Sequence, residues 1–457
     1  MTRRKITFPI AILSLGLFST AGTADRFTSV TPAEVTASPT QMPAVWTFDN
    51  CVEWAIENNT DVRKTLLNIL QNDQEIGTAK DAWLPSVGFS TSHSFTNYPS
   101  PEDRSSNNIY GSSYGINASW TVWEGNIRKY RLESAKISRQ RTQLSGDDLI
   151  NDLKLNILQA YLNIMYAKET VTIASQTLEV SESQTERARR FMESGRTSKA
   201  DFAQIESQAA QDRYNLVQAE SNYATAKMNL KKILTLGLDY DLQIADVTFS
   251  DNDVTSDLPP MDQVYTFAST WLPEMKSNEL SKQIYANDIK IAKAGYLPSI
   301  SLQGSLGTGY NSGGSLSWGS QMKGAFNENV GVTLSIPIFD GNYTRRAVAK
   351  ANLAAMEYDL DQKQLLDNLS QTIESLYIDA NNAKAKYTSG ITQLEATQTT
   401  ADLVDRQFEL GLVNPLELLT AHNNLLNARL ELLQSKFWAV LARKTIDFYA
   451  TTQIYIP

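Results

Sequence analysis

Two long stretches of the chain carry apolar residues at the spacing of a helix. Within residues 126–192 a stripe at steps of three and four runs through Ile150, Leu153, Ile157, Tyr161 and Ile164. Residues 342–409 repeat this design, and neither stretch contains a proline, which would interrupt a helix interior. The pattern therefore predicts two long helices, over 126–192 and 342–409.

A tight turn and a shorter helix are predicted after the first long helix. Gly195 ends that helix, because glycine readily takes the left-handed conformation found at helix C-termini. Ser198, with Asp201 three residues later, forms a capping box that begins a helix over residues 198–236. We expect the chain to double back at Gly195.

The second long helix is followed by the same design. Gly411 ends it, and Asn414 and Pro415 provide the N-cap and first position of a helix over residues 415–449. Apolar residues in this helix alternate steps of three and four, with Asn423 at one position of the series. This spacing predicts packing of the coiled-coil type.

Four segments have a period of two, with apolar residues on one side and small polar residues on the other. They predict β-hairpins over residues 86–123 and 299–339, whose connections are polar and rich in glycine. Such strands occur in transmembrane β-barrels and also in soluble β-sandwiches. Aromatic residues at the strand ends favour the membrane, because they resemble an interfacial girdle. These residues are Trp83, Trp120, Trp123, Tyr296 and Phe339.

The chain consists of two copies of one unit, assigned to residues 25–240 and 241–457. The sequence IGTAKDAWLPS at 76–86 matches IKIAKAGYLPS at 289–299, and WEGN later matches FDGN. Each unit holds a helix, a β-hairpin, a long helix, a turn and a shorter helix. The fold class is therefore mixed α+β with two internal repeats.

Helix lengths indicate how each unit is arranged. At about 1.5 Å per residue, the first long helix spans about 100 Å and its returning partner only about 58 Å. Helices predicted over 60–82 and 274–295 supply the missing length if they stack end to end with the returning helices. The remaining segments would then gather as a belt at mid-height; they are residues 25–58, 237–259 and 450–457.

Four strands per chain cannot close a β-barrel, because about eight is the smallest number in use. The chain is therefore expected to oligomerise. Two, three or four copies would each satisfy this requirement, and the pattern of residues leaves the number open.

Residues 1–24 are predicted to be a signal peptide. Basic residues at positions 3–5 precede an apolar stretch, and small residues end it at Ala24. Beyond Asp25 the sequence has no run of about 18 apolar residues, so helical membrane spans are not expected. This leaves a periplasmic, an extracellular or an outer-membrane protein.

Composition excludes several classes of function. The 457 residues include one Cys and two His, so neither an internal disulfide nor a recognisable zinc, haem or iron–sulfur site is expected. A formal net charge of −9 argues against nucleic-acid binding. No nucleophile is paired with a base, so we expect neither an enzyme nor a bound cofactor.

These motifs, duplicated and in order, resemble the TolC family of outer-membrane efflux and type I secretion channels. The LPS motifs, WEGN and FDGN, and the turns at Gly195 and Gly411 carry the resemblance. It implies a homotrimer whose 12-stranded barrel spans the outer membrane, in contact with its lipid, and continues as an α-helical tunnel through the periplasm. It also implies a tripartite system with a periplasmic adaptor and an inner-membrane pump of the RND, ABC or MFS type.

The resemblance also assigns roles to residues at the turns. Glu417, Thr420 and Asp201 would form the periplasmic entrance constriction, although Glu417 and Asp201 are also explained as helix-capping carboxylates. Val413 replaces a basic residue of the family's closed-state latch, which implies different gating contacts. Residues expected to dock the adaptor are Arg190, Gly195, Arg196, Arg406, Phe408, Gly411 and Leu412.

The leading hypothesis is a passive, water-filled exit duct for efflux, including multidrug efflux, or for type I secretion. The alternative is a secreted coiled-coil structural or adhesive protein, in which the strands form a small β-sandwich. The two differ in whether the apolar face of the strands is covered by protein.

Overall fold

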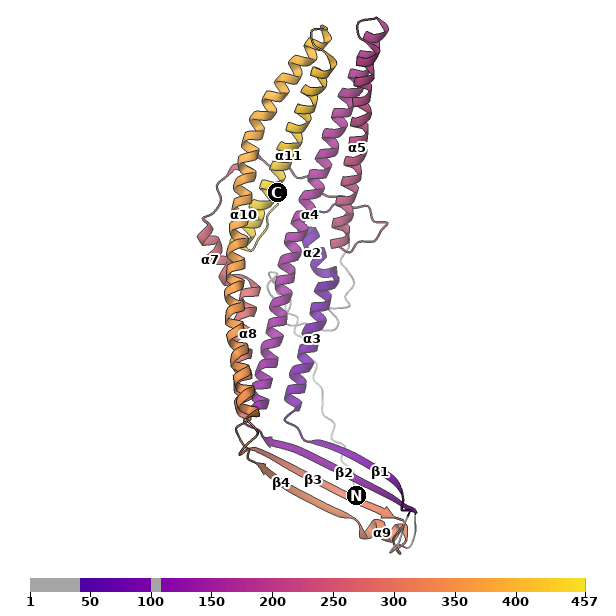
Figure 1. Ribbon diagram of the computed structural model, residues 1–457, viewed down its shortest axis with the longest axis vertical. Helices are drawn as coiled ribbons and strands as arrows, with labels where there is room; N and C mark the ends of the chain where they lie inside the picture. The colour runs from indigo at the N-terminus through magenta and orange to yellow at the C-terminus, as the bar shows by residue number, and fades with distance from the viewer. Residues whose placement is uncertain (1–41, 100–107, 457) are drawn as a thin grey trace, which may run out of the picture.

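The computed structural model describes residues 42–99 and 108–456, and two long helices run through it (Figure 1). They are α4 (Ile127–Glu193) and α10 (Tyr343–Glu409), and each has 67 residues. Both lie within one residue of the predicted bounds. The predicted signal peptide, residues 1–24, falls outside the described residues. Among the residues described, no helix is long and apolar enough to cross a membrane.

Shorter helices stand end to end in pairs beside the long ones (Figure 1). α3 and α5 contact α4, α11 contacts α10, and α8 contacts both long helices. Their bounds are Thr60–Asp81 for α3, Lys199–Ile233 for α5, Pro273–Ala294 for α8 and Pro415–Thr451 for α11. Because both units are built in this way, the mixed α+β fold with two repeats is confirmed.

Each strand hairpin leads into its long helix through two consecutive residues in the left-handed conformation. Gly125 and Asn126 have φ values of 64° and 66°, and Gly341 and Asn342 both have 66°. Glycine takes this conformation without a steric penalty and asparagine tolerates it. The WEGN and FDGN motifs therefore mark the same sharp change of direction in both units.

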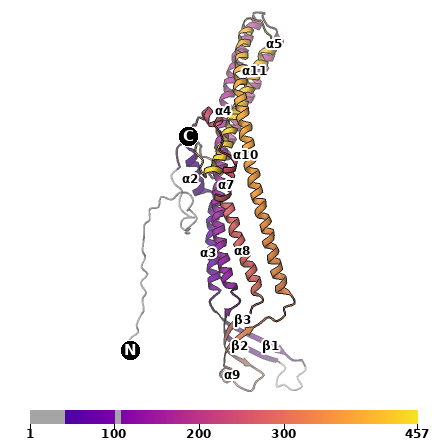
Figure 2. The same cartoon turned by 90° about the vertical axis from the view of Figure 1, so that its left-hand side faces the viewer.

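A single antiparallel sheet with strand order β1-β2-β3-β4 lies at one end of the helical layer, as both views show (Figures 1 and 2). The strands are β1 (Ser86–Asn97), β2 (Asn108–Trp123), β3 (Ser299–Asn311) and β4 (Asn327–Ser335). β4 ends four residues before the predicted position 339, because Pro337 has no N–H to donate to a ladder. The connection from β3 to β4 contains a short helix, α9 (Trp318–Gly324), that the sequence did not predict.

The strand register places apolar residues on one face of this sheet. Phe89 stands opposite Ile116, which stands opposite Leu306. Phe89 is 69% exposed and Val332, on the same face, is 72% exposed. In the part of the chain that the structure describes, no second sheet covers this face. The alternative hypothesis of a β-sandwich is therefore wrong.

A belt of short segments packs against the middle of α4. The indole Nε1 of Trp54 donates to the carbonyl of Leu234 at 3.0 Å, and Trp46 forms a parallel bridge with Ile244. The hydroxyl of Tyr161, on α4, donates to the carbonyl of Ala245 at 3.1 Å. Two helices lie within the predicted belt: α2 (Phe48–Asn58), which contacts α4, and α6 (Asp251–Thr255). α6 and the next helix along the chain, α7 (Met261–Trp271), contact α10 and α11.

Carboxylates gather on α4 where α8 begins. Burial raises the pKa of Asp148 to about 6, and the negative charges of Asp152 and Glu274 add to the effect. Burial also raises the pKa values of Asp152 and Glu274. The folded chain therefore binds a proton at Asp148 more tightly than the unfolded chain does.

This proton linkage predicts the effect of Asp148→Asn. Between the ordinary pKa and about 6 the folded state holds more protons, so the Asp148 carboxyl lowers stability as pH rises through that range. We expect Asp148→Asn to raise the thermal unfolding midpoint at pH 7.5 and to change it little at about pH 3, where the carboxyl is mostly protonated in both the folded and the unfolded state. Asp49→Asn serves as the control, and an equal shift at both pH values would contradict the prediction.

The duplicated junctions predict unequal effects of two matched substitutions. A left-handed alanine costs about 1–2 kcal/mol at either Gly125 or Gly341. At Gly125 the new Cβ would also lie 2.9 Å from the Cβ of Ala294, whereas at Gly341 no atom of the described chain lies within 4 Å. Overpacking adds about 1–3 kcal/mol, so Gly125→Ala should lower the thermal unfolding midpoint more than Gly341→Ala does. Equal losses would contradict this prediction.

Candidate functional site

The ends of the two helical hairpins, far from the sheet, have the same backbone structure (Figure 1). Gly195 and Gly411 have φ values of 73° and 75°. The N–H of Arg196 donates to the carbonyl of Phe191 at 2.8 Å, and that of Leu412 to the carbonyl of Gln407 at 2.9 Å. These are Schellman turns, which require a left-handed residue at the glycine position.

Capping residues begin the two returning helices. Ser198 and Asp201 exchange hydrogen bonds in a complete capping box. The N–H of Glu417 donates to the Asn414 side chain at 2.9 Å, and the Asn414 amide donates to Glu417 Oε1 at 3.1 Å. Glu417 and Thr420 are both exposed and share a face of α11, being three residues apart. Asp201 belongs to the other hairpin and is half-buried.

An apolar cluster and an ion pair hold the two hairpin ends together. Phe408 is buried at 5% exposure beside Ala188 and Leu418, and Arg187 pairs with Glu409. Phe408, one of the residues that the resemblance assigns to adaptor docking, fills the contact between the two hairpins. Arg190 and Arg406 are exposed, as expected. The guanidinium of Arg196 lies 4.4 Å from the centre of the Phe191 ring.

Exposed leucines cover the second turn. Leu410, Leu412 and Leu416 are 70%, 71% and 61% exposed. Only Leu412 was predicted. The other two could have been found by aligning the repeats, because the corresponding residues of the first turn are Ser194, Arg196 and Ala200.

Charge distinguishes the two turns further. Residues 186–201 hold five basic and three acidic residues, whereas the corresponding residues 402–417 hold one basic and four acidic. The same backbone thus presents a polar, cationic surface at one turn and an apolar, acidic surface at the other.

A polar contact joins the two hairpins a short distance along the helices from the turns. His422 Nε2, on α11, lies 2.9 Å from Asp405 Oδ1 on α10 and 2.7 Å from Gln184 Nε2 on α4. Three helices from both units therefore meet at His422.

Aromatic residues gather where the sheet meets the helices. The indole of Trp120 donates to the carbonyl of Trp83 at 2.9 Å, and the Arg128 guanidinium lies 4.8 Å from the Trp83 ring centre. Trp83, Trp120, Tyr296 and Phe339 are exposed, and Trp123 is half-buried. All five predicted girdle residues therefore lie at this junction.

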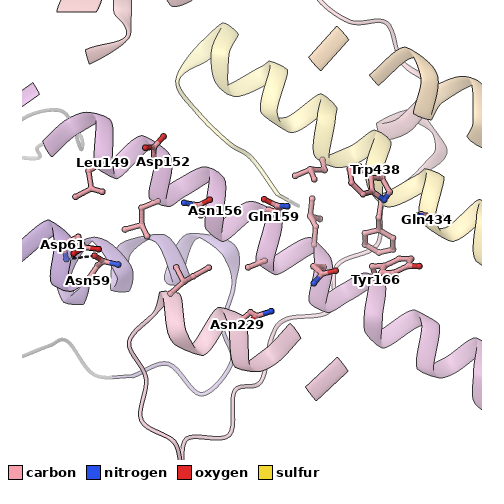
Figure 3. Close-up of a pocket in the computed structure, with 17 residues that line it drawn as sticks. Asn59, Asp61, Leu149, Asp152, Asn156, Gln159, Tyr166, Asn229, Gln434 and Trp438 are labelled. Carbon is pink, nitrogen blue, oxygen red and sulfur yellow. Dashed lines mark hydrogen bonds between the residues drawn. The ribbon is translucent and has the colours of Figure 1, made fainter. Parts of the chain in front are cut away.

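A recess of about 720 Å³ opens on the helical layer beside α4 (Figure 3). Gln159 and Asn163 lie two residues beyond Ile157 and Tyr161, so they point about 200° away from the belt. The lining combines side-chain amides with apolar and aromatic residues and two carboxylates. The amides belong to Asn59, Asn156, Gln159, Asn163, Asn229 and Gln434, the carboxylates to Asp61 and Asp152, and Phe437 and Trp438 are among the aromatic residues. The wall is therefore part polar and part apolar.

Comparisons with known proteins agree with this architecture. The sequence model described as outer membrane efflux protein matches residues 52–235 and 272–447. The chain is 23% identical to protein CyaE of Bordetella pertussis over 83% of this chain and 78% of that protein. It is 20% identical to outer membrane protein TolC of Escherichia coli over 83% of this chain and 77% of that protein.

A solved structure of CusC has a similar fold. Its TM-score is 0.73 at 19% identity, and the match covers 90% of this chain and 99% of that one. The resemblance to TolC-type channels that the motifs indicated is confirmed. The family match spans both repeats and most of the described helices. The chain therefore belongs to the outer membrane efflux protein family, as a channel protein of the outer membrane with its helices in the periplasm.

Proposed function

We propose that three copies of this chain form the exit duct of a tripartite efflux or type I secretion system. The observation that carries the proposal is the sheet, which has two open edges and an uncovered apolar face. Edge strands with free N–H and C=O groups need partners, and lipid offers none. Pairing β4 of one copy with β1 of the next closes the sheet, and three copies give the 12 strands that the TolC-family resemblance implies.

The helical layer supports the same ring. α10 lies at one edge of the layer and α3 and α5 lie at the other (Figure 1). α10 exposes Leu353 and Met356 at the level of α3, which exposes Leu67. Nearer the turns α10 exposes Ile391, and α5 exposes Tyr214 and Val217. A head-to-tail contact between these edges buries the exposed residues at both levels and closes on itself after a fixed number of copies. The belt takes the outer side of the ring, since it would block a tube, and the recess beside α4 then faces the lumen.

The hairpin ends are the surface for a periplasmic adaptor, which connects the duct to an inner-membrane pump. The exposed leucines around Gly411 favour burial by a partner, at about 1.5–3 kcal/mol for each large side chain. The exposed arginines around Gly195 favour an acidic surface on that partner. Among the entrance residues, Glu417 and Asp201 each contribute one carboxylate per copy and both accept a hydrogen bond at a helix N-terminus, whereas Thr420 is neutral.

The entrance role predicts the effect of Glu417→Gln. Gln keeps an oxygen that can accept the bond from Asn414 but removes the negative charge. We expect cation-over-anion selectivity in planar-bilayer recordings to fall at least about twofold, which requires a change of only about 0.4 kcal/mol in ion energy. Glu417→Asp is the control that keeps the charge. Unchanged selectivity in Glu417→Gln would leave this residue with a capping role alone.

The docking role predicts different effects at the two turns. Replacing Leu410 and Leu412 by Ser should lower adaptor co-purification from the host at least about tenfold, because two apolar anchors are lost. Replacing Arg190 and Arg196 by Ser should weaken the complex mainly at low salt, since screening removes exposed charge interactions at high salt. Trimer assembly on gels is the folding control. Full adaptor recovery with the leucine variant would exclude this turn as the docking surface.

A further inference from the structure

The connection between β3 and β4 is an ordered segment fixed to the end of β3. The last pair between these strands is Gly307 with Asn327, yet β3 continues to Asn311. Beyond Gly307, where β3 is no longer paired with β4, α9 contacts β3 instead. Gln321 accepts the N–H of Asn311 at 2.9 Å and donates to the carbonyl of Asn311 at 3.0 Å. Its side-chain amide thus takes the place of a neighbouring strand.

A second hydrogen bond shows which face of the sheet the segment covers. The hydroxyl of Thr308 donates to the carbonyl of Met322 at 2.6 Å. Thr308 lies on the same face of β3 as Leu306 and Tyr310, because residues two apart on a strand point to the same side. This is the apolar face of the sheet. The C-terminal half of α9 therefore sits against the apolar face, at the end of the sheet farthest from the helices (Figure 1).

Aromatic residues with polar groups lie on the same face at the same level. His93 Nδ1 lies 2.7 Å from the hydroxyl of Tyr110, and the two rings are stacked. Tyr114 and Tyr310 adjoin them. Rings with polar ends are enriched where a membrane meets water. They form a second aromatic band, opposite the one at the helical end of the sheet.

The distance between the two bands fits a bilayer. Trp120 and Tyr110 lie ten residues apart on β2, which is about 33 Å at about 3.3 Å per residue. A strand tilt of about 40° reduces this to about 25 Å, the height of the apolar band of outer-membrane barrels. α9 therefore lies at the level of the outer interface.

Large apolar side chains on this segment are left more than half exposed by the residues that the structure describes. Leu316, Trp318 and Phe326 are 62%, 55% and 55% exposed, and the neighbouring Lys323 is also exposed. Trp, Phe and Leu beside a Lys is the composition of segments that lie in a membrane interface. These side chains extend the exposed apolar surface of the sheet.

We propose that α9 and its flanking residues are a lipid-contacting segment of the outer leaflet. Leu316, Trp318 and Phe326 enter the boundary between headgroups and acyl chains, and Lys323 lies among the headgroups. The inference rests on the proposed function, because it requires the apolar face of the sheet to face lipid. It adds a contact that the strands themselves do not make, at the point where β3 extends past β4.

Nitroxide labels at single cysteines test this proposal in the full chain. The native Cys51 is fully buried and burial raises its pKa to about 12, so it does not compete for a thiol reagent. Labels are placed by Trp318→Cys, and by Phe326→Cys as a second position should the loss of Trp318 disturb the segment. Phe89→Cys marks the apolar face, and Ser92→Cys marks the polar face at the height of α9, since Ser92 pairs with Ser113, which pairs with Gly309.

The protein is reconstituted in vesicles of phosphatidylethanolamine and phosphatidylglycerol, and collisions with oxygen and with a water-soluble nickel chelate are measured by electron paramagnetic resonance. Oxygen concentrates in lipid and the chelate in water. For labels at 318 and 326, we expect the ratio of the oxygen collision rate to the nickel collision rate to lie between the ratios at 89 and 92. We also expect these labels to be mobile.

The other outcomes contradict either the inference or the proposed function, as follows. Labels at 318 and 326 as accessible to nickel as position 92, with position 89 in lipid, would overturn the inference and leave the proposed function intact. Labels shielded from both reagents and immobilised would assign the segment to a contact with a second copy, and would also overturn the inference. Nickel access at all four positions would contradict the proposed function itself.

Discussion

Backbone N–H and C=O groups at the edge of a sheet must find hydrogen-bond partners, and lipid supplies none. β1 and β4 each have one edge that no strand among the described residues occupies, and the face between them exposes Phe89 and Val332. Much of the remaining structure follows from this constraint. A sheet that closes with other copies fixes the spacing of the helices, because each hairpin passes into its long helix through a rigid left-handed pair of residues. In the proposed ring the helical layer has to curve with the sheet, and its own apolar edges meet those of the neighbouring copies.

The two repeats have the same backbone conformation at their turns and junctions, whereas the side chains at these places differ. Both turns are Schellman turns with the same bonds, and both junctions have nearly the same φ values. Side chains that do not take part in these bonds have diverged, so Leu412 occupies the place of Arg196. The backbone of a turn tolerates such changes because its conformation depends on the glycine and on main-chain bonds. The proposed ring of copies would therefore present two alternating kinds of surface to a protein that binds its end.

Sequence reasoning located the long helices because their ends carry local signals. Gly125 with Asn126, and Gly195 with the Ser198 cap, act within a few residues and need no tertiary context. α9 was missed because its residues have no helical pattern, and its position depends on Gln321 reaching Asn311 across the fold. The burial of Phe408 was missed for a related reason. Its surroundings come from the other hairpin, and a pattern along one helix does not reveal which face another unit will cover.

Hydrogen bonding and charge have separate tasks within the proposed duct. Amides in the recess beside α4 exchange hydrogen bonds with water as readily as with cargo, so each such bond contributes only about 1 kcal/mol to holding a molecule there. Carboxylates act at longer range, and they occur at two levels: Glu417 lies at the far end, where the helices turn, and Asp61 and Asp152 line the recess. Discrimination by charge would then begin where a molecule enters and continue along the wall. Neither weak hydrogen bonding nor charge discrimination supplies energy, so in the proposed system the driving force has to come from the inner-membrane pump to which the adaptor connects the duct.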